Sequence, residues 1–205
     1  MKRTPIAAAL AALGLLAAVP AAQAAPAVAL ATNCTPQKAT VHPFASWNDL
    51  GSYTLVSGGD AEGALSGWTL NGAGVVEGNE PFKVGRSTDH RSIALVGGAS
   101  VTTAPICIDS TYPWFRFFAR NTSGRSAQLK VDVLYTDTLG RLRDAGTGDY
   151  TAVDGAWVPT GSLGIAIAWQ SLPPGSSLPV SFRFTAVGSA SWQVDDVYVD
   201  PYARR

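Results

Sequence analysis

Five side chains in the second half of the chain are of the types that a sugar-binding surface uses. Strand-like alternation places Trp114, Arg116 and Phe118 on one side of a short segment. The same alternation places Asp132 and Arg183 opposite the apolar residues of two later segments. An aromatic ring can stack on the C–H face of a sugar, while arginine donors and a carboxylate acceptor can bind its hydroxyl groups. If these segments were neighbours in one sheet, the five residues would form one glycan-binding face.

The same residues also have a purely structural interpretation. Arg116, Asp132 and Arg183 could form a cross-strand ladder of ion pairs on a solvated sheet, stabilising it by a few tenths of a kcal/mol per pair. Alternation defines the face on which each residue lies, but not the order of the strands. The residues alone therefore leave both interpretations open.

Residues typical of enzyme active sites are scarce. The chain has two histidines, His42 and His90, and three glutamates, Glu62, Glu77 and Glu80. Sequence motifs of serine hydrolases, zinc proteases and P-loop enzymes are absent. A pair formed by Glu62 and an aspartate could support hydrolysis, but no feature of the sequence favours such a pair. We therefore expect a protein that is not an enzyme, with a hydrolase on a β-sandwich scaffold as an alternative.

The first 24 residues have the features of a signal peptide. Lys2 and Arg3 form a charged start, an apolar run extends from Ile6 to Val19, and residues 22–24 read Ala-Gln-Ala, a small-residue cleavage site. The apolar run is shorter than the roughly 20 residues of a membrane-spanning helix. The sequence therefore predicts a secreted, extracellular protein that has no membrane association after cleavage.

The two cysteines of the chain, Cys34 and Cys107, both follow the signal peptide. Export favours a disulfide, and neither cysteine has a neighbour that would activate a thiol. Residues 25–52 then form an extended N-terminal arm that the disulfide holds in place. We expect Phe44 and Trp47 of this arm to cover an edge or end of the core.

Residues 53–205 predict a single all-β domain. Glycine, asparagine and proline signals separate short apolar segments, and no helical periodicity persists. This pattern of short strands between turn signals is typical of a two-sheet antiparallel β-sandwich. The equal numbers of basic and acidic residues, 15 of each, indicate no basic patch that could bind nucleic acid. The expected strands are Trp68–Leu70, Val75–Glu77, Ser92–Val96, Ser100–Thr103, Trp114–Arg120, Ala127–Thr136, Val180–Ala186 and Ser191–Val199.

Two distant stretches carry a family resemblance. Residues 58–70 contain a Gly-rich turn, Glu62 and a Gly-Trp pair, and residues 191–201 contain aromatic residues around Asp195-Asp196-Val197. Together they resemble the opening and closing strands of secreted jelly-roll modules of the galactose-binding-like, carbohydrate-binding type. The resemblance implies jelly-roll topology and a glycan ligand.

The resemblance also implies a structural calcium ion. Such modules often bind one through the opening glutamate and the closing aspartate, which correspond here to Glu62 and Asp195, with Asp60 and Asp196 as second choices. Carboxylate oxygens are the ligands that Ca²⁺ prefers. The chain departs from the family at Ala61, where an aromatic residue is usual, and this departure could shift Glu62 away from the ion.

The sequence as a whole predicts a secreted, non-catalytic binding module for carbohydrate or cell-wall glycan. A structural or protein-interaction domain without a small ligand is the first alternative. An exposed aromatic groove would favour glycan binding. A flat polar face would favour the structural alternative, and a pair of carboxylates in a cleft would favour the hydrolase. The identity of the ligand and the oligomeric state do not follow from the sequence.

Overall fold

The computed structural model describes residues 34–37, 41–112, 114–137, 139–152, 155–165, 167 and 175–200. The predicted signal peptide, residues 1–24, lies outside the described residues. Within those residues, no helix combines the length and the apolar character needed to cross a membrane.

The regular elements of the described chain are nearly all β-strands, as the alternation predicted. A short 3₁₀ helix, η1 (Ala45–Trp47), precedes them. The strands are β1 (Thr54–Leu55), β2 (Thr69–Asn71), β3 (Gly74–Glu77), β4 (Arg91–Val96), β5 (Ser100–Thr102), β6 (Ile106–Asp109), β7 (Trp114–Asn121), β8 (Ala127–Thr136), β9 (Leu142–Ala152), β10 (Val158–Pro159), β11 (Leu163–Gly164), β12 (Ser177–Ala186) and β13 (Ser191–Asp200).

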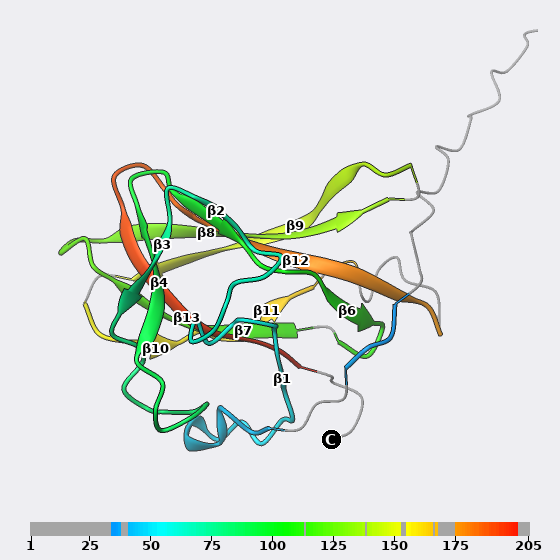
Figure 1. Cartoon of the computed structure of the whole chain (residues 1–205), viewed down its shortest axis with the longest axis horizontal. Coiled ribbons are helices and arrows are strands. Elements are labelled where there is room, and N and C mark those ends of the chain that lie inside the picture. Colours follow the sequence, from blue (N-terminus) through cyan, green and yellow to red (C-terminus); the bar gives the residue numbers. More distant parts are fainter. Residues whose placement is uncertain are drawn as a thin grey trace, which may run out of the picture.

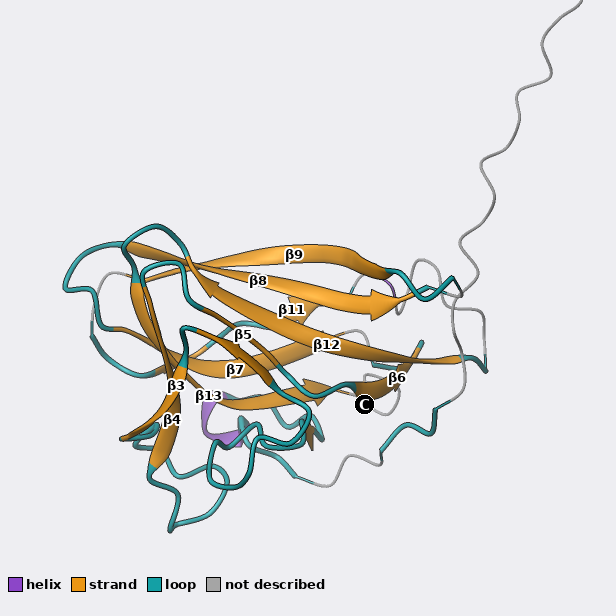
Figure 2. Cartoon of the chain, turned by 45° about the horizontal axis from the view of Figure 1, so that its top comes forward, coloured by secondary structure: helices purple, strands orange, loops and turns teal. Residues whose placement is uncertain are grey.

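The strands form two antiparallel sheets that pack face to face, which confirms the jelly-roll β-sandwich. The seven-stranded sheet has the order β10-β7-β13-β4-β3, with β1 on β13 and β11 on β7. The six-stranded sheet has the order β2-β5-β12-β8-β9, with β6 on β12. Figures 1 and 2 show the two layers, with β8, β9 and β12 lying above β7 and β13.

The core fills the space between the two layers with the apolar faces that alternation had assigned. Phe115 and Phe117 of β7 meet Phe182 and Phe184 of β12, with ring centroids 4.3 and 4.8 Å apart. All four rings are almost completely buried. Because each ring removes a large apolar area from water, these contacts between sheets contribute strongly to the stability of the sandwich.

The opening and closing segments of the domain lie side by side. Thr54 and Leu55 of β1 pair with Val199 and Tyr198 of β13, and Val56 N–H donates to the Val197 carbonyl oxygen. This pairing brings the two stretches that carry the family resemblance into one region of the molecule.

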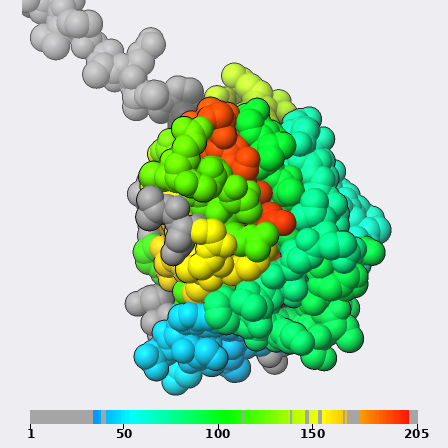
Figure 3. All heavy atoms as spheres, turned by 90° about the vertical axis from the view of Figure 1, so that its left-hand side faces the viewer, coloured from blue at the N-terminus to red at the C-terminus, as the bar shows by residue number. Residues whose placement is uncertain are grey.

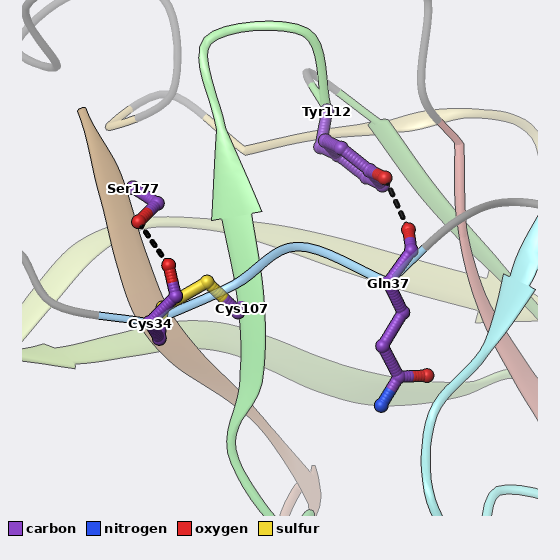
Figure 4. Close-up of a disulfide and its surroundings, with 5 residues drawn as sticks. All are labelled: Cys34, Gln37, Cys107, Tyr112 and Ser177. Carbon is purple, nitrogen blue, oxygen red and sulfur yellow. Dashed lines mark hydrogen bonds between the residues drawn. A yellow bond between two sulfur atoms is a disulfide. The ribbon is translucent and has the colours of Figure 1, made fainter. Parts of the chain in front are cut away.

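The predicted disulfide is present and ties the start of the described chain to β6. Cys34 and Cys107 are bonded to each other across 73 residues of sequence. Figure 4 shows two further contacts of this segment: Ser177 Oγ donates to the Cys34 carbonyl oxygen at 2.5 Å, and the Tyr112 hydroxyl donates to the Gln37 carbonyl oxygen. The segment is therefore attached to both β6 and β12.

We expect loss of this disulfide to destabilise the protein. A Cys34→Ser/Cys107→Ser double variant should lose about 2–4 kcal/mol of unfolding free energy, because the long loop is no longer closed in the unfolded chain. Urea unfolding measures the loss, and Ser177→Ala, which removes only the hydrogen bond, serves as the control. Two free thiols in the denatured, unreduced protein would contradict the assignment.

Candidate functional site

The single glycan-binding face predicted from alternation does not form. Trp114, Arg116 and Phe118 lie on β7 of the seven-stranded sheet, whereas Asp132 and Arg183 lie on β8 and β12 of the six-stranded sheet. The two groups face outward from opposite sides of the sandwich. The prediction required these strands to be neighbours, and they belong to different sheets.

The β7 part of that predicted face is covered by the N-terminal arm. Phe118 is fully buried, and the Phe44 ring stacks on it at a centroid distance of 5.4 Å. Trp47 also packs on Phe118, at 5.6 Å. In Figure 1, η1 lies below the seven-stranded sheet, on the side away from the six-stranded sheet. The arm therefore covers an outer face of the sandwich, and Phe118 is not available to a ligand.

Arg116 is part of the same covered region. Its guanidinium carbon lies 3.9 Å from the centre of the Phe44 ring, its Nη1 donates to Asp49 at 2.7 Å, and its Nε donates to the Thr160 carbonyl oxygen at 2.8 Å. These contacts satisfy the guanidinium within the protein. Trp114, at the start of β7, is only half-buried.

The other two predicted residues do meet, on the outer face of the six-stranded sheet. Arg183 and Asp132 are direct cross-strand partners, and Arg183 donates to Asp132 Oδ2 through Nη2 at 2.6 Å and Nε at 2.9 Å. Lys130 Nζ lies 2.8 Å from Asp132 Oδ1. Burial opposes ionisation, but the hydrogen bonds from Lys130 and Arg183 outweigh it, so the pKa of Asp132 is lowered.

Polar side chains extend this ion-pair network across the sheet in two rows. The first row contains Thr69, Thr102, Arg183 and Asp132, and the second contains Asn71, Ser100, Thr185, Lys130 and Asp149. In Figure 2 this face is turned toward the viewer, and no other described segment crosses β8 and β12. We call these two rows the polar face. It offers positioned cationic donors and many hydroxyl groups, but its rows contain no aromatic side chain.

A second cluster of polar residues, all acidic, lies at the outer side of β13. Sequence reasoning identified Glu62 and Asp195, with Asp60 and Asp196 as second choices, but missed two members in the β3–β4 loop. Nothing in the sequence placed that loop beside β13. We call the set the acidic cluster; its members are Asp60, Glu62, Glu80, Asp89, Asp195 and Asp196.

Backbone amides hold most of these carboxylates in place. Glu62 Oε1 accepts the N–H groups of His90 and Arg91, each at 2.6 Å. The Glu80 carboxylate accepts three successive N–H groups of the loop that follows it, from residues 82–84. Asp195 Oδ2 accepts the Glu80 N–H at 3.2 Å, which joins the β3–β4 loop to β13.

Asp196 has the least compensated carboxylate of the cluster. It lies at an irregularity of β13 with a left-handed φ of 53°, and its Oδ1 is buried without a hydrogen-bond partner in the described residues. Burial, together with the nearby carboxylates Glu80 and Asp89, raises the pKa of Asp196 to about 8. Burial and Asp196 together raise the pKa of Asp195 to about 9. These two adjacent buried acids therefore have no basic partner among the residues that the structure describes.

The fit of this cluster to a calcium ion is partial. Its oxygens are hard donors of the kind that Ca²⁺ binds, and Asp196 Oδ1 has no hydrogen-bond partner in the described part of the chain. Glu62 belongs to the same neighbourhood, since its charge raises the pKa of Asp196. However, the described residues do not bring three His, Cys, Asp or Glu side chains together in an arrangement that could hold a metal ion.

No protein-family model matches the chain, and no curated protein matches it in sequence. Solved structures of similar shape include the CBM22-1 xylan-binding domain of Paenibacillus barcinonensis Xyn10C, at 15% identity and a TM-score of 0.48, with 75% of this chain and 97% of that domain covered. The C-terminal family 22 carbohydrate-binding module of Clostridium thermocellum Xyn10B has 15% identity and a TM-score of 0.47, with 75% and 94% covered. TmCBM61 in complex with β-1,4-galactotriose has 13% identity and a TM-score of 0.41, with 69% and 92% covered. Because the sequence identities are so low, these structures do not identify binding residues in this chain.

Proposed function

We propose that the chain is a secreted, non-catalytic module that binds a carbohydrate or cell-wall glycan through the polar face. The observation that carries the proposal is the network of Arg183, Asp132 and Lys130 at the centre of a sheet face that no other described segment covers. Asp132 fixes both cations, so their remaining N–H groups have defined directions toward solvent. Fixed charged donors among hydroxyl-bearing residues suit a ligand rich in hydroxyl groups.

The geometry of the carboxylates supports a non-catalytic role. Hydrolysis of a glycosidic bond requires two carboxyl groups that reach the substrate from opposite sides. Asp132 is buried beneath its two cations, and Asp195 and Asp196 are each only 2% exposed. A glycan cannot approach any of these three groups directly in this conformation.

Glycan binding is expected to depend on Arg183. An Arg183→Ala variant should bind its polysaccharide about tenfold more weakly, because it loses charge-assisted donors while Lys130 still pairs with Asp132. Affinity electrophoresis against a panel of soluble cell-wall polysaccharides measures the loss. Arg141→Ala serves as the control, because it removes an exposed arginine from the β8–β9 hairpin outside the polar face.

One observation favours the alternative of a structural or protein-interaction domain: the polar face has no aromatic side chain on which a sugar could stack. If the wild type retains no polysaccharide of the panel, or if Arg183→Ala binds as tightly as wild type, the glycan-binding role of this face is excluded. The structural alternative then takes its place.

We further propose that Ca²⁺ binds at the acidic cluster as a structural ion, with Asp196 as its principal ligand and Glu62 and Asp195 beside it. The raised pKa values of Asp195 and Asp196, which show that their ionised forms are poorly stabilised, and the unpartnered Asp196 Oδ1 support this site. The ion would supply the missing counter-charge between the β3–β4 loop and β13, and so would stabilise the fold.

A further inference from the structure

A second group of outward-facing residues lies on the seven-stranded sheet, beyond the part that the arm covers. Arg120 of β7 pairs directly with Gln193 of β13, and Gln193 pairs with Ala94 of β4, which pairs with Gly74 of β3. The neighbours of Gln193 along β13, residues 192 and 194, point into the core. The row of four residues, which we call the Arg120 row, therefore faces outward.

The row contains polar atoms that are buried and have no partner. Gln193 is only 8% exposed, and its Oε1 has no hydrogen-bond partner among the described residues. Arg120 Nε is buried and is likewise unpartnered within the described chain. Leaving such atoms unpaired costs about 1–3 kcal/mol each, so two of them side by side on an outer face point to an external partner.

Arg120 also lacks a counter-ion. Its guanidinium carbon lies 5.5 Å from the centre of the Trp157 ring, and no carboxylate of the described residues forms an ion pair with it. The nearest acidic residue along β13, Asp195, accepts hydrogen bonds from the backbone N–H groups of residues 80 and 196 instead. Within the part of the chain that the structure describes, the positive charge of Arg120 therefore has no carboxylate partner and could bind an anionic group.

The far end of the row, two strands away from Gln193, is open. A Cβ atom added at Gly74 would meet no other atom within 4 Å, and Ala94 contributes only a methyl group to the row. Phe82, from the β3–β4 loop, is 44% exposed and packs edge-on against Trp47 of the arm. Figure 3 shows this side of the molecule, where β13 (red) reaches the surface between β3 and β4 (green) and residues 155–165 (yellow).

The chemistry of the row defines the ligand. A guanidinium offers only donors and is suited to a carboxylate, while the Gln193 carbonyl oxygen requires a donor such as a hydroxyl group. A ligand that carries a carboxylate beside hydroxyl groups on one ring satisfies both. We propose that the Arg120 row binds a uronic acid residue, with the carboxylate on Arg120 and a ring hydroxyl donating to Gln193 Oε1. This goes beyond the proposed function, because it is a second site on the opposite sheet and is selective for a charged sugar.

The test compares two sugars that differ only at C6, methyl β-D-glucuronide and methyl β-D-glucoside. In ¹H–¹⁵N NMR titrations of the mature protein at millimolar sugar, the glucuronide should shift the side-chain resonances of Gln193 and Trp157, and the glucoside should not. Arg120→Gln should weaken glucuronide binding about tenfold or more, because the charge-assisted hydrogen bonds are lost.

Arg125→Gln is the matched control, because it removes an equal charge near the end of β7 from a residue that contacts Ser189 outside the row. Binding of the glucuronide that survives Arg120→Gln, or no binding by the wild type, would overturn the proposal. The outcome is separate from that for the polar face. Polysaccharide binding that depends on Arg183 tests only the polar face, and glucuronide binding that depends on Arg120 tests only this row.

Discussion

Replacing Phe44 with alanine is expected to destabilise the folded protein by about 3–5 kcal/mol, the range observed for large aromatic side chains removed from a core. Phe44 is fully buried although it belongs to the arm. Its ring contacts Phe118 at 5.4 Å, Tyr53 at 4.9 Å and Tyr198 at 5.9 Å. It also covers the Arg116 guanidinium, which would become partly solvated when the ring is removed.

The expected loss is large because the arm forms a second apolar cluster outside the sandwich core. This cluster contains Phe44, Tyr53, Phe118, Trp157 and Tyr198, and Phe44 contacts three of the others. The remaining rings cannot close the space, since Phe118 and Tyr198 are fixed on paired strands of one sheet.

Urea unfolding followed by circular dichroism measures the effect, and Leu50→Ala is the control. Leu50 lies in the same arm but is 77% exposed, so its loss should change the unfolding free energy by less than about 0.5 kcal/mol. Equal effects of Phe44→Ala and Leu50→Ala would show that the arm is not packed on β7 in solution.

The fold was predictable where the strands alternate strongly. The four long strands β7, β8, β12 and β13 correspond closely to the predicted segments, because each has an apolar face that must be buried. The long strand β9 (Leu142–Ala152) was missed. Its sequence contains Gly146, Gly148 and several polar residues, so it has no apolar alternation. It lies at the edge of its sheet and is held by pairing with β8.

The candidate site was less predictable than the fold, for a topological reason. Alternation correctly placed Asp132 and Arg183 opposite the core, and they are partners. It could not show that Arg116 belongs to the other sheet, or that Phe44 covers the neighbouring Phe118. The expectation that Phe44 and Trp47 cover part of the core was close, but they cover the outer face of β7. Residues that meet only through the tertiary fold, such as Glu80 and Asp195, leave no local signal in the sequence.

Without divalent cations, the stability of the protein is expected to fall as the pH rises from about 4 to 9. Asp195 and Asp196 have pKa values of about 9 and 8 in the fold, against an ordinary value of 3.8. A carboxyl whose pKa is raised on folding contributes stability below its ordinary pKa, and this contribution is lost as the pH rises through the folded value. Each proton that the folded state holds and the unfolded state has lost lowers the unfolding free energy by at most about 1.4 kcal/mol per pH unit.

Calcium should suppress this loss, because an ion at the acidic cluster favours the ionised carboxylates that burial otherwise penalises. Thermal unfolding at pH 5 and pH 8, with EGTA or with added Ca²⁺, gives four midpoints that test both effects. With EGTA the midpoint should be lower at pH 8 than at pH 5, and Ca²⁺ should raise it mainly at pH 8. Equal midpoints with EGTA and Ca²⁺ at pH 8 would exclude the structural ion.

Asp196→Asn separates the role of the carboxylate from that of the backbone. Asparagine tolerates the left-handed φ of 53° at this position, so the irregularity of β13 should persist without the charge. The variant should be more stable than wild type at pH 8 with EGTA and should respond weakly to Ca²⁺. Glu77→Gln is the control, since its side chain is 78% exposed and should leave both effects unchanged. A variant that responds to Ca²⁺ as strongly as wild type would show that binding of the ion does not require Asp196.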